Sequence, residues 1–117
     1  KDIAHALSLI CRGNGHVQHF YSVAQHSLAC AKEAKTRRYS KEVILGCLLH
    51  DSSEAYLSDV TRPIKRKLTY YLEVEDVLQN IIWKHFIQRD LTKEETKLAF
   101  ETIENEFIEF YKETMEI

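Results

Sequence analysis

Glycine and proline are scarce in this chain, with three Gly and one Pro among 117 residues. Tight turns depend on these two residue types, and a β-sandwich needs many such turns. Two of the three glycines, Gly13 and Gly15, also share a single loop. The sequence therefore predicts an all-α fold, and its length is that of one domain.

Composition and charge exclude several classes of protein. Hydrophobic residues make up 44% and charged residues 29% of the chain, which excludes a disordered or collagen-like chain. Sixteen basic against eighteen acidic residues give a net charge of −2, so we expect no nucleic-acid partner. No apolar run is long enough for a transmembrane helix, so we expect no membrane partner. Three cysteines without a CxxC pair are typical of reduced thiols in a cytoplasmic protein.

The hydrophobic and capping pattern predicts a compact bundle of about five or six helices. Ser22, Ser40 and Thr92 are the expected N-caps, and Thr92 is followed three residues on by Glu95, as in a capping box. Residues 43–49 are apolar all round, so their helix should be central and buried. We expect one domain over residues 1–117, truncated at one or both ends. The expected helices cover residues 2–10, 22–35, 40–49, 63–68, 70–88 and 92–115.

A histidine and an aspartate, His50 and Asp51, end this buried helix. Polar residues after seven apolar ones are costly to bury unless both have partners. A simple His–Asp hydrogen bond at a helix end would satisfy them. However, Glu54 and Asp59 follow closely, and a basic cluster comes just after them (Arg62, Lys65, Arg66 and Lys67). Carboxylates and a histidine beside basic residues favour a metal-and-phosphate site.

His26 is a candidate third ligand, because its helix is rich in small residues that permit close packing against a neighbour. A lone histidine in such a helix is otherwise a core residue. Imidazole and carboxylate together suit one divalent ion such as Mn²⁺, Fe²⁺, Co²⁺, Ni²⁺ or Zn²⁺. The identity of the ion stays open, with Mg²⁺ included.

The segments SVAQHS and LLHDSSEAYLSDVTRPIK carry a specific pattern of a histidine, then His-Asp, with Glu and Asp at fixed offsets. In this pattern the sequence resembles the HD-domain metal-dependent phosphohydrolase superfamily, and within it the small 5′-deoxynucleotidase-like branch. The resemblance covers about residues 3–80. It implies an HD-type helical bundle that holds one divalent metal ion.

The resemblance also implies roles for individual residues. His26, His50 and Asp51 would bind the metal. Glu54 would be a catalytic proton donor or orient the water, and Asp59 would contact the sugar of the substrate. The remaining matched positions would bind substrate phosphate: Arg12 and His16 in the loop before His26, and Lys65 in a Pro-x-Lys element with Pro63.

Family members supply a fourth ligand, an aspartate, from a late helix, whereas this chain has no Asp after Asp90. At 100° per residue, the apolar residues of the last helix fill about half of its circumference, and Glu104 falls inside that arc. We therefore expect Glu104 to be the fourth metal ligand. The alternative that Glu104 extends to the rim of the core, or pairs with a buried Arg or Lys, remains open. The apolar arc comprises Ala99, Phe100, Ile103, Phe107, Ile108, Phe110, Tyr111 and Met115.

The expected function is hydrolysis of a phosphomonoester by a metal-dependent enzyme, with a nucleoside or deoxynucleoside 5′-monophosphate as the expected substrate. A degenerate HD domain that binds nucleotide or metal without turnover is one alternative. A helical domain with a purely structural role, docking its acidic last helix on a basic partner, is another. A triphosphohydrolase or alarmone hydrolase also remains open, as do the base, the sugar and a homodimeric state.

Overall fold

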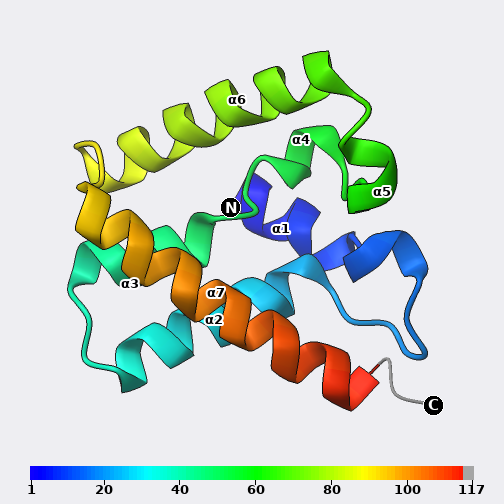
Figure 1. Ribbon diagram of the computed structural model, residues 1–117, viewed down its shortest axis with the longest axis horizontal. Helices are drawn as coiled ribbons and strands as arrows, with labels where there is room; N and C mark the ends of the chain where they lie inside the picture. The colour runs from blue at the N-terminus through cyan, green and yellow to red at the C-terminus, as the bar shows by residue number, and fades with distance from the viewer. Residues whose placement is uncertain (115–117) are drawn as a thin grey trace.

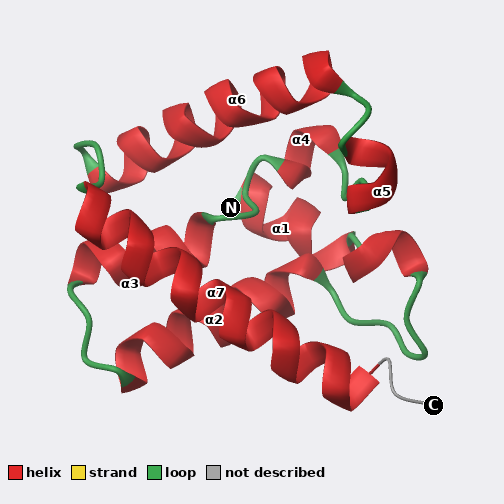
Figure 2. Ribbon diagram, viewed as in Figure 1, coloured by secondary structure: helices red, strands yellow, loops and turns green. Residues whose placement is uncertain are grey.

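With so few turn residues, the chain is helical through most of the part that the structure describes. The computed structural model describes the backbone of residues 1–114, and all side chains in that range except those at positions 62, 63, 107 and 110–114. This range contains no β-strand, as Figures 1 and 2 show. The all-α prediction is confirmed, and none of these helices is long and apolar enough to cross a membrane. The elements in chain order are α1 (Asp2–Leu9), a 3-10 turn η1 (Arg12–Gly15), α2 (Val23–Thr36), α3 (Lys41–Leu49), α4 (Glu54–Leu57), α5 (Arg62–Lys65), α6 (Thr69–Ile87) and α7 (Lys93–Thr114).

Three helices begin at the caps that the sequence predicts. Ser22 Oγ accepts the Gln25 N–H at 3.1 Å, and the Gln25 side-chain oxygen accepts the Ser22 N–H at 2.8 Å. Thr92 and Glu95 form the same reciprocal pair at 3.1 and 2.8 Å. Ser40 Oγ accepts a backbone N–H of the first turn of α3 at 3.3 Å. Each cap satisfies an N–H group that the first helical turn leaves unpaired, which fixes where the helix starts.

Helix α3 is the central element, as predicted, and it packs against α2, α6 and α7. The buried residues between α2, α3 and α7 are small, and this allows these three helices to approach one another closely. A Cβ atom added at Gly46 would lie 3.2 Å from Leu91 Cδ1, so glycine admits the segment before α7. The buried cluster comprises Cys30, Ala34, Val43, Cys47 and Ala99.

Helix α7 turns a different face to the core from the one that its hydrophobic pattern predicts. Ala99 and Thr102 are buried on this face, and Glu106 is half-buried one turn further on. Phe100 is 54% exposed and packs edge-on against Trp83 of α6, with 6.5 Å between the ring centroids. At 100° per residue, the buried face is rotated by roughly a quarter-turn from the predicted arc.

The prediction that Glu104 faces the core is therefore wrong, because its side chain is exposed. The cause is a second apolar face on α7, which includes the exposed Phe100 and Ile108. The apolar arc predicted from the sequence contains residues of both faces. Its centre therefore differs from the centre of the face that is buried. The predicted arc positions 107, 110, 111 and 115 lie outside the described side chains.

A single glutamine of α6 holds the turn that follows α3. Gln79 Nε2 donates to the Leu49 carbonyl at 2.6 Å, and Gln79 Oε1 accepts the Ser53 N–H at 3.1 Å. Gln79 is buried, so these bonds are shielded from water. This contact positions residues 50–53, which carry the polar residues of the candidate site.

We expect Gln79→Leu to lower the free energy of unfolding by about 1–3 kcal/mol, because it leaves the buried Ser53 N–H without this partner. Urea denaturation would measure the change. The matched control is Asn80→Ala at the exposed neighbouring position, which should change stability by less than about 0.5 kcal/mol. Equal effects of the two substitutions would contradict the role of Gln79.

Candidate metal centre

Three side chains predicted as metal ligands meet where α2 passes the end of α3. His26 lies within α2 and is fully buried. His50 is the residue directly after α3, and Asp51 follows it. Because α2 and α3 pack closely through small residues, the His26 ring reaches the end of α3.

The three polar atoms of this group form a small triangle. His26 Nε2 lies 3.1 Å from His50 Nε2, which in turn lies 2.9 Å from Asp51 Oδ2. The third side, from His26 Nε2 to Asp51 Oδ2, is 3.7 Å. Ligand atoms bound about 2.1 Å from one ion lie roughly 3.0–3.5 Å apart in octahedral or tetrahedral geometry. The three sides of the triangle, 2.9, 3.1 and 3.7 Å, are close to this spacing, so the three atoms can bind one divalent ion after shifts of a few tenths of an ångström.

A backbone contact sets the orientation of the His50 ring. His50 Nδ1 lies 2.7 Å from the Cys47 carbonyl oxygen, so Nδ1–H donates to that oxygen. The other nitrogen, Nε2, then faces His26 and Asp51. Metal-binding histidines are commonly held by such a hydrogen bond from the nitrogen that does not bind the ion.

The charges at the centre favour a carboxylate beside a positive group. Burial alone would lower the pKa of His50, but Asp51 and the hydrogen bonds to Asp51 and the Cys47 carbonyl raise it. Burial likewise opposes ionisation of Asp51, yet His50, followed by His26 and Arg12, holds its pKa well below the usual range. Burial, aided by the charges of Arg12 and His50, lowers the pKa of His26 to about 3. His26 is therefore neutral near pH 7 and has a lone pair to offer.

Sequence reasoning did not include Cys30 in this centre. His26, Cys30 and His50 form a candidate metal-binding group, with ligand atoms within 4.8 Å of one another. Cys30 Sγ lies 3.6 Å from Nε2 and 3.8 Å from Nδ1 of His26, so it contacts both nitrogens almost equally. Burial and the charge of Glu106 raise the pKa of the Cys30 thiol, which is therefore protonated at neutral pH. Its spacing of four residues from His26 could have revealed it.

Glu54 begins α4 and lies buried near the centre. Its Oε2 atom has no hydrogen-bond partner among the described residues. Burial, followed by the negative charges of Asp51 and Asp59, raises the pKa of Glu54 to about 10, although Lys65 and Arg12 oppose this shift. Glu54 therefore carries a proton at neutral pH and can act as a hydrogen-bond or proton donor.

The glycine loop after α1 is tied to the connection between α4 and α5. The Gly13 N–H, in the left-handed region with φ of 66°, donates to Asp59 Oδ2 at 2.6 Å. The residue before Asp59 is held as well, because the Tyr71 hydroxyl donates to the Ser58 carbonyl at 3.1 Å. Arg12, next to Gly13, lies 3.7 Å from the aspartate of the centre. Asp59, predicted to contact a sugar, thus also has a structural partner that sequence reasoning missed.

Two residues predicted to bind phosphate lie outside the triangle. Lys65 Nζ is paired with Glu75 Oε2 at 2.7 Å and lies 5.9 Å from the centroid of the Tyr71 ring. His16 is exposed, in the loop after η1. Contact between either residue and phosphate stays a prediction.

Helix α7 approaches the centre through Glu106, whereas Glu104 points to solvent. The charge of Glu106 acts on the buried Cys30 thiol, which packs against the His26 ring. Glu106 follows the buried Thr102 by four residues and so lies on the same face of α7. That spacing would have identified Glu106 once the buried face of α7 was known.

The comparisons with known proteins match two relatives and no family model. Over 82 residues the chain is 42% identical to the uncharacterized protein YfdR of Escherichia coli (strain K12), covering 70% of this chain and 43% of that protein. Over 95 residues it is 35% identical to the uncharacterized protein RCAP_rcc00048 of Rhodobacter capsulatus, covering 74% of this chain and 46% of that protein. The matched region thus spans less than half the length of these relatives, and their names state no activity.

With metal removed by a chelator, Glu54→Gln should stabilise the protein near neutral pH. The pKa of Glu54 is raised from 4.5 to about 10, so the unfolded chain releases a proton above pH 4.5 that the folded chain keeps. The free energy of unfolding therefore falls as the pH rises above 4.5. Glutamine does not ionise, so the variant does not show this decrease. We expect a gain of roughly 1–3 kcal/mol near pH 7 that vanishes near pH 4. Urea denaturation across this range would measure it, and a difference independent of pH would contradict the assignment.

Proposed function

We propose that this chain is a metal-dependent phosphohydrolase that acts on a phosphomonoester, with a nucleoside or deoxynucleoside 5′-monophosphate as substrate. The convergence of His26 Nε2, His50 Nε2 and Asp51 Oδ2 within 2.9–3.7 Å carries this proposal. The resemblance of the surrounding motifs to the HD-domain phosphohydrolases supports the same chemistry. Since the match covers less than half of each relative, the proposal concerns the site that this chain itself contains.

The donor set fits a divalent transition metal. His26, His50 and Asp51 would hold the ion, because three acceptor atoms this close repel one another unless a proton or cation lies among them. Asp51 is a better third ligand than Cys30, because its carboxylate is ionised whereas the raised pKa keeps the thiol protonated. When bound, the ion supplies Lewis-acid stabilisation of the negative charge on a phosphate group.

The residues around the centre supply the other parts of the reaction. Glu54, protonated at neutral pH, would donate its proton to the leaving oxygen of the ester. Arg12, whose side chain lies 3.7 Å from Asp51 Oδ2, would offset the charge of the phosphate. Asp59 accepts one hydrogen bond from Gly13 and, as a carboxylate, has further acceptor sites for a sugar hydroxyl.

Binding of metal or nucleotide without turnover is the second candidate function. The exposure of Glu104 favours it, because α7 then lacks a ligand at the position where the sequence predicts the fourth one. Phosphate release separates the two functions, since only the enzyme hydrolyses the ester.

Purified protein supplied with Mn²⁺ or Co²⁺ should release phosphate from a 5′-nucleotide, and a chelator should stop the reaction. Asp51→Asn should abolish metal binding and turnover together. Glu54→Gln should keep the metal and lower the rate by roughly 10²–10⁴, the usual effect of losing a general acid. The matched control is Asp76→Asn on the exposed surface of α6, which should change neither. Metal binding without phosphate release would favour the second candidate, and activity that survives chelation would exclude a metal-dependent mechanism.

The two glutamates of α7 make a second test of the centre. Glu106→Gln should weaken metal affinity about tenfold, the effect typical of losing a supporting group beside the ligands. Glu104→Gln, an identical change two residues away on the exposed side, should leave affinity unchanged. Isothermal titration with Mn²⁺ or Co²⁺ would measure both. A loss of affinity for Glu104→Gln alone would instead support Glu104 as the fourth metal ligand.

A further inference from the structure

Helix α6 contacts the rest of the molecule along one side of its circumference. Gln79 and Ile82 are buried on this face, and Trp83 Nε1 donates to the Gly46 carbonyl of α3 at 3.3 Å. Helical geometry places these three α6 residues within an arc of about 100°. Ile87 is also buried, and Tyr71 and Glu75 contact Ser58 and Lys65 from the same side of α6. The opposite side of the helix is left open.

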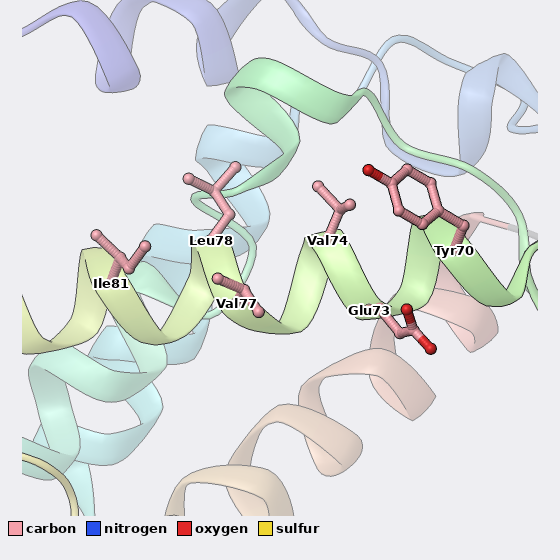
Figure 3. Close-up of a pocket in the computed structure, with 6 residues that line it drawn as sticks. All are labelled: Tyr70, Glu73, Val74, Val77, Leu78 and Ile81. Atoms are coloured by element: carbon pink, nitrogen blue, oxygen red, sulfur yellow. The ribbon is translucent and has the colours of Figure 1, made fainter.

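The face of α6 opposite this contact is apolar. Tyr70 is 78% exposed, Val77 59% and Ile81 59%, with Val74 half-buried between them. These four residues are spaced by four, three and four positions, which is the spacing of a coiled-coil seam. We call them the α6 stripe. A shallow hollow of about 420 Å³ runs along it, lined by Tyr70, Glu73, Val74, Val77, Leu78 and Ile81 of α6 alone (Figure 3).

The charges beside the stripe change sign along the helix. Glu73 and Asp76 lie in the first half of α6, and Lys84 and His85 lie in the last turn. Glu73 and Lys84 are both exposed, and neither forms an ion pair in the described part of the chain. Their charges are therefore available to a partner.

An antiparallel copy of α6 would match this pattern. A two-fold axis between Val77 and Ile81 places each of these residues opposite the other in the second copy. The same register brings Glu73 of each copy to Lys84 of the other, so the apolar residues and these two charges are complementary across the interface. A parallel arrangement would leave Glu73 and Lys84 about 16 Å apart along the helix axis, so these two charges could not pair.

We propose that the α6 stripe is a homodimer interface in which two copies of this chain pair their α6 helices antiparallel around Val77 and Ile81. The stripe is short, about 16 Å from Tyr70 to Ile81 at 1.5 Å per residue. An interface of this length lies at the small end of specific protein contacts, so we expect a weak and reversible dimer. The proposal does not rest on the metal centre, since none of the predicted ligands lies on α6.

Sedimentation equilibrium of the purified chain should show a reversible monomer–dimer equilibrium. Ile81→Glu should make the protein monomeric at all accessible concentrations while its circular dichroism and melting temperature stay close to wild type, because the site is exposed. The matched control is Phe86→Glu, also at an exposed apolar residue of α6 (49%) but on the other side of the helix. This control should dimerise as the wild type does.

A charge exchange tests the orientation of the pair. Glu73→Lys and Lys84→Glu should each weaken the dimer by about tenfold, because each places like charges opposite one another. The double variant should recover the wild-type dissociation constant. A wild-type protein that stays monomeric, or a dimer that Ile81→Glu leaves intact, would overturn the proposal. Failure of the double variant to recover would overturn the antiparallel register.

Discussion

The burial of three acceptor atoms in one small triangle is the constraint on which the rest of this structure depends. His26 Nε2, His50 Nε2 and Asp51 Oδ2 lie 2.9–3.7 Å apart. Such a group is stable only with positive charge at its centre, whether a proton on His50 or a cation. The small residues between α2, α3 and α7 are necessary for this, because larger ones would hold His26 away from the end of α3. The small core residues therefore have a role in positioning His26 as well as in stabilising the fold.

Two carboxyl groups three residues apart take opposite protonation states at this site. Asp51 is ionised because the positive charges of His50 and Arg12 lie beside it and outweigh the cost of its burial. Glu54 stays neutral because burial and the nearby Asp51 charge both oppose its ionisation. Pairs of groups whose environments separate their pKa values are the usual basis for dividing acid and ligand roles. The division follows from position in the fold, since both groups are ordinary carboxyls in the unfolded chain.

Features set by neighbouring residues could be predicted from the sequence, and those set by distant packing could not. Caps such as Ser22 and Thr92 depend only on groups three residues away, and the fully apolar segment of α3 signals its own burial. The face that α7 buries depends instead on what covers its two apolar sides, so Glu104 was misplaced and Glu106 overlooked. The bond from Gly13 to Asp59 joins residues 46 positions apart and leaves no local pattern.

Helix α6 links the candidate site to the surface of the molecule. Gln79 holds the Ser53 N–H and the Leu49 carbonyl, on either side of the segment that carries His50 and Asp51. The exposed Val77 and Ile81 flank Gln79 in sequence and lie on the opposite side of the same two turns. A helix is stiff over two turns, so a contact that restrains Val77 and Ile81 also restrains Gln79 and the turn that it holds. The unpartnered face of α6 and the geometry of the centre are therefore connected through one buried side chain.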